Sequence, residues 1–169
     1  MIRFRHRDAQ IVLKPGESWS AVGRETTYRD TAAENLWSIV EEVKNGTPWR
    51  KVVNDRFATS NPWLNQIVTS PARALFFHQN PPAPASTVLD IGAGWGQIAL
   101  PLARETDARV TVLEPTPERL AFIQAAAKQE KVADRMNFMQ SDFLEVEFEP
   151  VFDLVCCIGV LEWVPKFRH

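Results

Sequence analysis

The sequence has little of what marks secreted, membrane-spanning or nucleic-acid-binding proteins. Its 169 residues hold only two cysteines, Cys156 and Cys157, and one adjacent pair makes no disulfide framework. No apolar run approaches the roughly 20 residues of a membrane span, and no apolar stretch follows the basic opening "MIRFRHRDAQ" as a secretory signal requires. A formal net charge of -2 gives no electrostatic attraction to nucleic acid. We therefore expect a cytoplasmic protein with no membrane partner and no nucleic-acid partner.

The composition is that of an ordinary globular domain, and the chain divides at one proline-rich stretch. Hydrophobic residues make up 45% and charged residues 24% of the sequence, and a chain of this length is enough for one sizeable core. The stretch "QNPPAPAST" contains prolines that interrupt regular structure. We predict an N-terminal helical segment over residues 1–80, a linker over 81–86 and an α/β core over 87–169.

The two parts differ in their predicted secondary structure. Before the linker, apolar residues at helical spacing and polar residues followed by proline predict four short helices, over 31–46, 47–57, 61–69 and 70–79. After it, strands over 87–91, 109–115, 136–142 and 152–159 alternate with helices over 95–105 and 116–132. Near-continuous apolar strands separated by helices indicate a parallel sheet covered on both faces. The expected fold class is α/β, a Rossmann-like doubly wound parallel sheet preceded by an N-terminal helical segment.

The first strand of this sheet leads into the glycine-rich loop of "STVLDIGAGWGQIAL". Ligands of open α/β sheets bind beyond the carboxyl ends of the strands. The dinucleotide fingerprint is G-x-G-x-x-G, whereas Gly92, Gly94 and Gly96 are spaced G-x-G-x-G and Gln97 replaces the third glycine. The carboxylate of Asp90 would repel a pyrophosphate and attract a cationic ligand. S-adenosylmethionine has an ammonium and a sulfonium group and no phosphate, so it fits this loop better than a dinucleotide does.

Acidic residues at the next two strand ends favour the same ligand. Glu114 ends the second strand, 24 positions after Asp90, where its two carboxylate oxygens can accept from both ribose hydroxyls. Asp142 and Phe143 follow the third strand, where an acid can accept from the adenine amino group while an aromatic ring packs on the adenine. Pro115 is either a turn residue or a ligand contact.

Together these elements resemble the class I S-adenosylmethionine-dependent methyltransferases, from about Thr87 to the end of the chain. The segments "VLDIGAGWG", "VLEP", "SDF" and "FDLVCCIGVLEWV" are similar to four successive motifs of that family. The resemblance implies S-adenosylmethionine as cofactor, S-adenosylhomocysteine as product, and a substrate cover formed partly by the N-terminal helices. It assigns the cofactor site to Asp90, Gly92, Ala93, Gly94, Gly96, Glu114, Pro115, Asp142, Phe143, Ile158, Gly159 and Leu161.

The chain departs from the family after its fourth strand. The family core has seven strands, whereas this sequence ends soon after "FDLVCCIG", so only the first half of the core is expected. The fourth strand would then be a sheet edge that exposes "LVCCI", which is an aggregation hazard. We expect either the missing C-terminal half of a longer protein or self-association to cover this edge.

The function expected from these motifs is that of an S-adenosylmethionine-dependent methyltransferase, or a fragment of one, acting on a small-molecule or sugar-like acceptor. Three alternatives stay open: a non-catalytic module that binds S-adenosylmethionine or S-adenosylhomocysteine, an NAD-dependent oxidoreductase, and an aminopropyl transferase. No catalytic residue and no metal site is predicted, because His6, His78 and His169 form no motif with an acidic partner.

Several residues keep two interpretations at this stage. Tyr28 and Arg73 are candidates for closing over the carboxylate of the cofactor. Glu162 and Trp163 either line an acceptor pocket or begin a helix that packs on the sheet. Asp153 is interpreted as a residue of strand packing.

Overall fold

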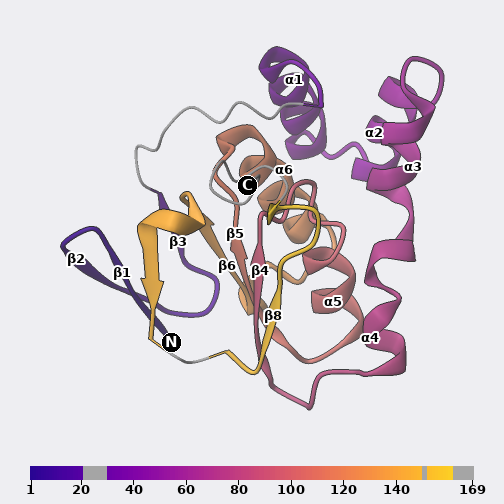
Figure 1. Ribbon diagram of the computed structural model, residues 1–169. Coiled ribbons are helices and arrows are strands. Elements are labelled where there is room, and N and C mark those ends of the chain that lie inside the picture. The colour runs from indigo at the N-terminus through magenta and orange to yellow at the C-terminus, as the bar shows by residue number, and fades with distance from the viewer. Residues whose placement is uncertain (21–29, 150–151, 162–169) are drawn as a thin grey trace.

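The computed structural model describes residues 1–20, 30–149 and 152–161 and is built on a five-stranded sheet (Figure 1). Its neighbouring strands are all parallel and follow the order β3-β6-β5-β4-β8. The bounds are β3 (Ser18–Ser20), β4 (Thr87–Ile91), β5 (Arg109–Leu113), β6 (Met136–Gln140) and β8 (Leu154–Cys156). The four strands predicted after the linker, and the α/β fold class, are confirmed. In the described part of the sheet, β8 lies at one edge.

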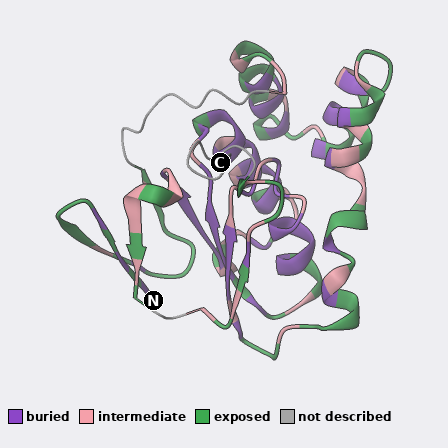
Figure 2. Ribbon diagram, in the orientation of Figure 1, coloured by how far each residue is buried: buried purple, intermediate pink, exposed green. Residues whose placement is uncertain are grey.

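Two helices cover one face of this sheet, α5 (Ala99–Glu105) and α6 (Pro117–Gln129). Alternate strand residues such as Val88, Val110 and Val112 are buried in the same cluster as the apolar residues of these helices. Figure 2 shows this buried layer running through the centre of the molecule. The predicted helix start at residue 95 is wrong, because Gly96 has a φ of +77°, which keeps the loop out of helical conformation.

The N-terminal helices form an outer layer over α5 and α6 (Figure 1). Two of them begin at a polar side chain as predicted: Asn61 accepts a hydrogen bond from the Leu64 N–H, and Ser70 accepts one from the Ala72 N–H. The bounds are α1 (Ala33–Lys44), α2 (Trp49–Phe57), α3 (Pro62–Thr69), η1 (Pro71–Ala74) and α4 (Phe76–Gln79). The predicted linker 81–86 contains no helix or strand. It joins this layer to β4.

The first 20 residues are strands, so the prediction of a helical segment over the whole of 1–80 is wrong there. The strands β1 (Ile2–His6), β2 (Ala9–Leu13) and β7 (Val146–Phe148) form an antiparallel sheet in the order β2-β1-β7. In β1, Ile2, Phe4 and His6 are buried while the arginines between them are exposed. Alternation of buried and exposed residues with a period of two indicates a half-buried strand. This alternation was missed in the sequence because the segment was considered only as a basic opening.

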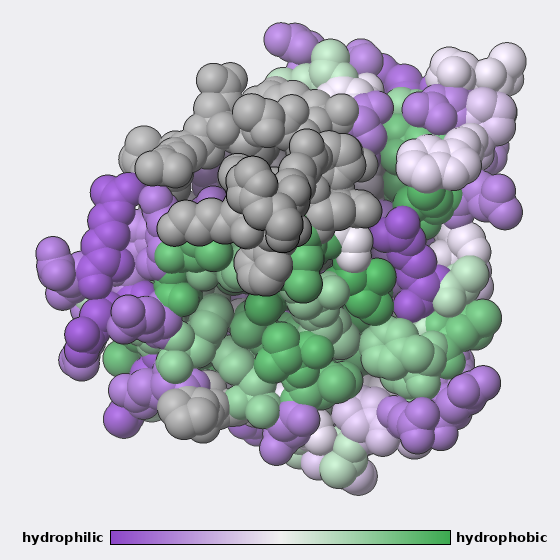
Figure 3. All heavy atoms as spheres, in the orientation of Figure 1, coloured by the Kyte–Doolittle hydropathy of each residue, from purple (hydrophilic) through white to green (hydrophobic). Residues whose placement is uncertain are grey.

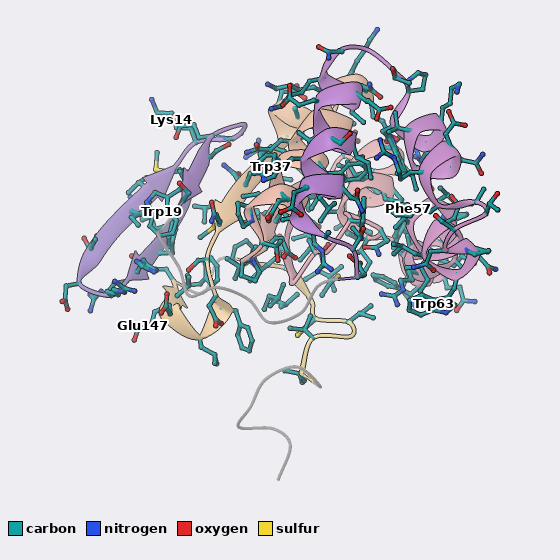
Figure 4. All side chains as sticks on the ribbon, turned by 90° about the horizontal axis from the view of Figure 1, so that it is seen from above. Lys14, Trp19, Trp37, Phe57, Trp63 and Glu147 are labelled. Atoms are coloured by element: carbon teal, nitrogen blue, oxygen red, sulfur yellow. The ribbon has the colours of Figure 1, made fainter. Side chains whose placement is uncertain are left out.

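The small sheet covers the second face of the large sheet, where helices were expected. Leu89, Leu113 and Met139 of the parallel strands share a buried cluster with apolar residues of β1 and β2. Trp19 of β3 packs edge-on against Phe4, with ring centroids 5.2 Å apart, and lies beneath the hairpin in Figure 4. The described residues therefore cover both faces of β4, β5 and β6, one face with helices and the other with strands.

Exposed apolar side chains gather near β8. Val155, Ile158 and Leu161 are each more than two-fifths exposed. Figure 3 shows apolar surface over this region of the molecule. Among the described residues, no helix is both long and apolar enough to span a membrane.

Candidate functional site

The glycine loop lies at the carboxyl end of β4 and is tied to the neighbouring strand. The backbone N–H groups of Gly92 and Ala93 donate to the carbonyl of Leu113 at 2.7 and 3.4 Å. Gly92, Gly94 and Gly96 have φ values of +64°, +58° and +77°, the left-handed region in which glycine is favoured. A side chain at any of these three positions would therefore strain the loop.

Asp90 lies one residue before the end of β4, beneath this loop, and is 2% exposed. Its Oδ2 atom has no hydrogen-bond partner in the part of the chain that the structure describes. Burial raises the pKa of this carboxyl from 3.8 to about 7, while a hydrogen bond from the Ala99 backbone lowers it and the charge of Glu114 raises it. An unpartnered buried carboxylate oxygen is costly. Its position suits a ligand that brings a hydrogen-bond donor or a positive charge.

Glu114 follows β5 and holds the loop from the other side. Its Oε2 accepts from the Gly94 N–H at 2.8 Å and its Oε1 accepts from the Thr116 N–H at 3.0 Å. Burial raises the pKa of Glu114, and the positive charge of Arg119 together with these hydrogen bonds lowers it. Each carboxylate oxygen has two lone pairs, and the Thr116 side chain also bonds this carboxylate, so only part of the acceptor capacity is left for a ligand hydroxyl. Two buried carboxylates at one loop disfavour a pyrophosphate.

Asp142 and Phe143 lie after β6, at the same edge of the sheet. Asp142 accepts from the Leu144 N–H at 3.0 Å through Oδ1 and begins the short η3 turn (Phe143–Glu145). The half-buried ring of Phe143 packs against the cluster that joins the two sheets. The structure therefore places both residues beyond the third strand, as the sequence predicts, and their contact with adenine stays a prediction.

The segment after β8 reaches the glycine loop through the side chain of Val160, whereas the family resemblance implies only backbone contacts from residues 158–161 near the sulfonium. A Cβ atom built on Gly92 would lie 2.5 Å from Cγ2 of Val160, so the valine side chain lies directly against this glycine. The neighbouring Ile158 and Leu161 are largely exposed, and Gly159 has a φ of +71°. Val160 lies inside the motif "FDLVCCIGVLEWV", but only the folded chain shows that its side chain packs on the loop.

Three residues in or behind the loop were also missed in the sequence. The indole of Trp95, in the middle of "GAGWG", donates from Nε1 to Oδ2 of Asp30 at 2.8 Å. The guanidinium of Arg119 in α6 lies 2.9 Å from the other carboxylate oxygen of Asp30. Nothing in the sequence spacing links these three positions.

Other candidate residues lie elsewhere in the fold. Asp153 accepts from the backbone N–H and the hydroxyl of Thr87 through Oδ2, at 2.7 and 2.9 Å, and these bonds lower its pKa. It therefore joins β8 to the start of β4, which confirms its interpretation as a packing residue. Arg73 lies in η1, in the outer helical layer. Tyr28, Glu162, Trp163 and His169 lie outside the described residues.

Each of the two described histidines lies beside a glutamate, and the two cysteines are free thiols. His6 lies 3.4 Å from Glu145, and His78 lies 3.1 Å from Glu105, in the small sheet and the helical layer respectively. Burial raises the pKa of the Cys156 thiol to about 11, which keeps it protonated at neutral pH. No cluster of three metal-ligating side chains occurs among residues 1–20, 30–149 and 152–161.

A cavity of about 340 Å³ lies between α2, α3 and α5, on the helix side of the loop. Neither Asp90 nor Glu114 lines it. Its two arginines, Arg50 and Arg104, are 2.7 and 3.3 Å from the carboxylate of Glu130, so their charges already have a partner. The candidate site is therefore the carboxyl edge of the sheet and not this cavity.

The chain was compared with known protein families, and residues 88–169 match the family described as a methyltransferase domain. The match begins inside β4 and includes all of the predicted site residues. Asp30 and the N-terminal strands and helices lie outside it.

Curated relatives each match less than half of this chain. A ubiquinone biosynthesis O-methyltransferase from Rickettsia akari is 33% identical over 82 residues, which is 48% of this chain and 32% of that protein. A sterol 24-C-methyltransferase from Saccharomyces cerevisiae is 35% identical over 82 residues, 48% of this chain and 21% of that protein. A tRNA1(Val) (adenine(37)-N6)-methyltransferase from Actinobacillus pleuropneumoniae is 33% identical over 70 residues, 40% of this chain and 30% of that protein. The chain spans no more than about a third of the length of these relatives.

Proposed function

We propose a function on the premise that residues 88–169 belong to the class I S-adenosylmethionine-dependent methyltransferases. The chain carries the cofactor-binding half of an enzyme that transfers a methyl group from S-adenosylmethionine to a small-molecule or sugar-like acceptor. The observation that carries this proposal is the buried, unpartnered Oδ2 of Asp90 beside a glycine loop that Glu114 holds in place.

The donor groups at the sheet edge fit this cofactor by their chemistry. Asp90 supplies a carboxylate for the ammonium group at the mouth of the loop, where its raised pKa falls once a positive charge is bound. Glu114 supplies acceptors for the ribose hydroxyls, with Pro115 beside it. Asp142 and Phe143 supply an acceptor and an aromatic surface for adenine.

The remaining contacts come from backbone and small side chains. Gly92, Ala93, Gly94 and Gly96 allow the ligand to approach the loop, and the segment 158–161 lies over Gly92 through Val160. Bound S-adenosylmethionine supplies an electrophilic methyl group on sulfur. The residues of the chain bind and orient it and exclude water, which is how proximity and orientation lower the barrier of a displacement reaction.

A small-molecule acceptor is supported by two of the relatives, whose names refer to ubiquinone biosynthesis and to a sterol. A third relative is named for tRNA, so the absence of a nucleic-acid partner rests on the net charge of -2 alone. A cytoplasmic location is proposed from the two free cysteines. The edge strand β8 is proposed to be covered either by self-association or by the C-terminal half of a longer protein. The non-catalytic binding module is the less favoured candidate, since the named relatives are methyltransferases.

Calorimetric titration of the whole chain with S-adenosylmethionine, S-adenosylhomocysteine and NAD tests this proposal. We expect micromolar binding of the first two ligands, none of NAD, and at least tenfold weaker binding in Asp90→Asn and Glu114→Gln. Asp153→Asn is the matched control, because it changes a carboxylate at the opposite strand end. A folded chain that binds neither sulfur ligand, or that binds NAD more tightly, would overturn the proposal.

A further inference from the structure

A buried ion pair joins the N-terminal half of the chain to the back of the glycine loop. Asp30 precedes α1, Trp95 lies inside the loop, and Arg119 lies in the first turn of α6. The Asp30 carboxylate accepts from Trp95 Nε1 at 2.8 Å through one oxygen and lies 2.9 Å from Arg119 through the other. The side chains of Asp30 and Arg119 are only 11% and 5% exposed. One carboxylate therefore bridges two elements that flank the candidate site.

Trp95 connects the Asp30 carboxylate to the loop, because it is itself a loop residue. Its ring packs edge-on against Phe57 of α2 and Phe122 of α6, with centroids 5.9 and 5.0 Å apart. Figure 4 shows Phe57 on the inner side of the helical layer. Trp95 stands between Gly94 and Gly96, whose left-handed backbones favour glycine. The packed and hydrogen-bonded indole therefore restrains the backbone between these two glycines.

Arg119 stands near both Asp30 and Glu114, the acidic residue that follows β5. Its positive charge is among the groups that lower the pKa of Glu114 against the effect of burial. Glu114 in turn accepts from the Gly94 N–H. Asp30 thus contacts the loop directly through the indole, and its ion-pair partner Arg119 is a charge that acts on Glu114.

The arrangement is not explained by stability alone. Burying an ion pair costs desolvation that its attraction only partly offsets, and apolar residues often serve the fold as well or better. Here the pair joins residues that belong to the match with methyltransferases to one residue outside it. A site function accounts for a charged residue at this place.

We propose that Asp30 is a positioning residue of the cofactor site, which fixes Trp95 and Arg119 and thereby holds the glycine loop and Glu114 in the geometry that binds S-adenosylmethionine. This inference rests on the proposed function. It makes the N-terminal half a part of the cofactor site through a residue that touches no ligand.

The test is calorimetric titration of the whole chain and its variants with S-adenosylhomocysteine. Asp30→Asn keeps an oxygen acceptor for the indole and removes the charge opposite Arg119, whereas Asp30→Ala removes both. Trp95→Phe keeps a ring and removes the N–H group. Thr31→Ala is the matched control, because Thr31 hydrogen-bonds Asn35 on the same segment and not the loop.

We expect Asp30→Ala to weaken binding about tenfold, the effect of one charge-assisted hydrogen bond, and Asp30→Asn to weaken it less. When Asp30→Ala is added to Trp95→Phe, it should weaken binding further by clearly less than tenfold, because Trp95→Phe has already removed the hydrogen bond between the indole and Asp30. Thr31→Ala should bind as the unmodified chain does. Circular dichroism and urea unfolding establish that each variant is folded, and Asp30→Asn preserves the test if Asp30→Ala does not fold.

A merely structural role would lower the free energy of unfolding and leave the dissociation constant of the folded chain unchanged. If the unmodified chain binds and both Asp30 variants bind equally well, the role of Asp30 is overturned and the proposed function is not. No binding by the unmodified, folded chain would overturn the proposed function and the role of Asp30 with it.

Discussion

Replacing Gly92 with alanine tests how closely the segment after β8 is fitted to the glycine loop. The φ of Gly92 is +64°, and an alanine in this left-handed region costs about 1–2 kcal/mol. The added Cβ atom would lie 2.5 Å from Cγ2 and 3.3 Å from Cγ1 of Val160, whereas carbon atoms normally lie at about 3.5–4.0 Å. Overpacking of this kind adds about 1–3 kcal/mol. We therefore expect Gly92→Ala to lower the free energy of unfolding by about 2–5 kcal/mol.

Two further variants separate the strain from the contact. Gly46→Ala is the control for strain, because Gly46 has a φ of +98° and no neighbouring atom within 4 Å of an added Cβ. Val160→Ala removes the atoms that the added Cβ would meet. The double variant Gly92→Ala/Val160→Ala should therefore lose about 1–3 kcal/mol less free energy of unfolding than the sum of the losses in the two single variants. Urea unfolding followed by circular dichroism measures these differences. If Gly92→Ala destabilises the chain no more than Gly46→Ala does, or if Val160→Ala restores nothing, Val160 does not pack on the loop as described.

Three other predictions follow from the site and the helix ends. Asp90 has a pKa of about 7 in the folded chain and 3.8 as its ordinary value, so the folded form retains the proton longer as pH rises. The free energy of unfolding should thus fall between pH 3.8 and about 7, by up to roughly 4 kcal/mol, and urea unfolding of Asp90→Asn should lack this fall. Glu114→Gln places an amide donor against a backbone N–H, so the free energy of unfolding, measured by thermal unfolding, should fall by about 1–3 kcal/mol. Unchanged stability would contradict the hydrogen bonds assigned to this carboxylate. Asn61→Ala removes the acceptor for the Leu64 N–H at the start of α3 and should cost about 1 kcal/mol, while Asn61→Asp should cost little; equal losses in urea unfolding would show that the cap does not matter.

Much of the parallel sheet was predictable because its signals are local. The apolar runs before Asp90 and Glu114, and the glycine spacing between them, are confined to short segments of sequence. Parallel strands place their carboxyl ends at one edge, so residues at strand ends lie near each other in any such sheet. For this reason Asp90, Glu114 and Asp142 could be assigned to the same edge without a structure.

The rest depends on contacts between distant parts of the chain. The strand β3 pairs with β6 across more than a hundred residues, and no periodicity in three residues such as Ser18–Ser20 indicates that pairing. The contact of Val160 with Gly92 and the bridge from Asp30 to Trp95 and Arg119 likewise exist only after folding. Local patterns carry no information on such contacts, because many side chains would fit each position until packing selects one.

The central claim is that S-adenosylmethionine binds at the carboxyl edge of the sheet. It is tested most directly by titrating the isotope-labelled chain with S-adenosylhomocysteine and following its backbone amide signals by NMR. The account predicts that the amides of Gly92, Gly94 and Glu114 shift with one common dissociation constant, while those of Thr69 and Ser70 in the cavity beside α3 stay in place. Shifts confined to the cavity, or no shifts in a folded chain, would contradict it.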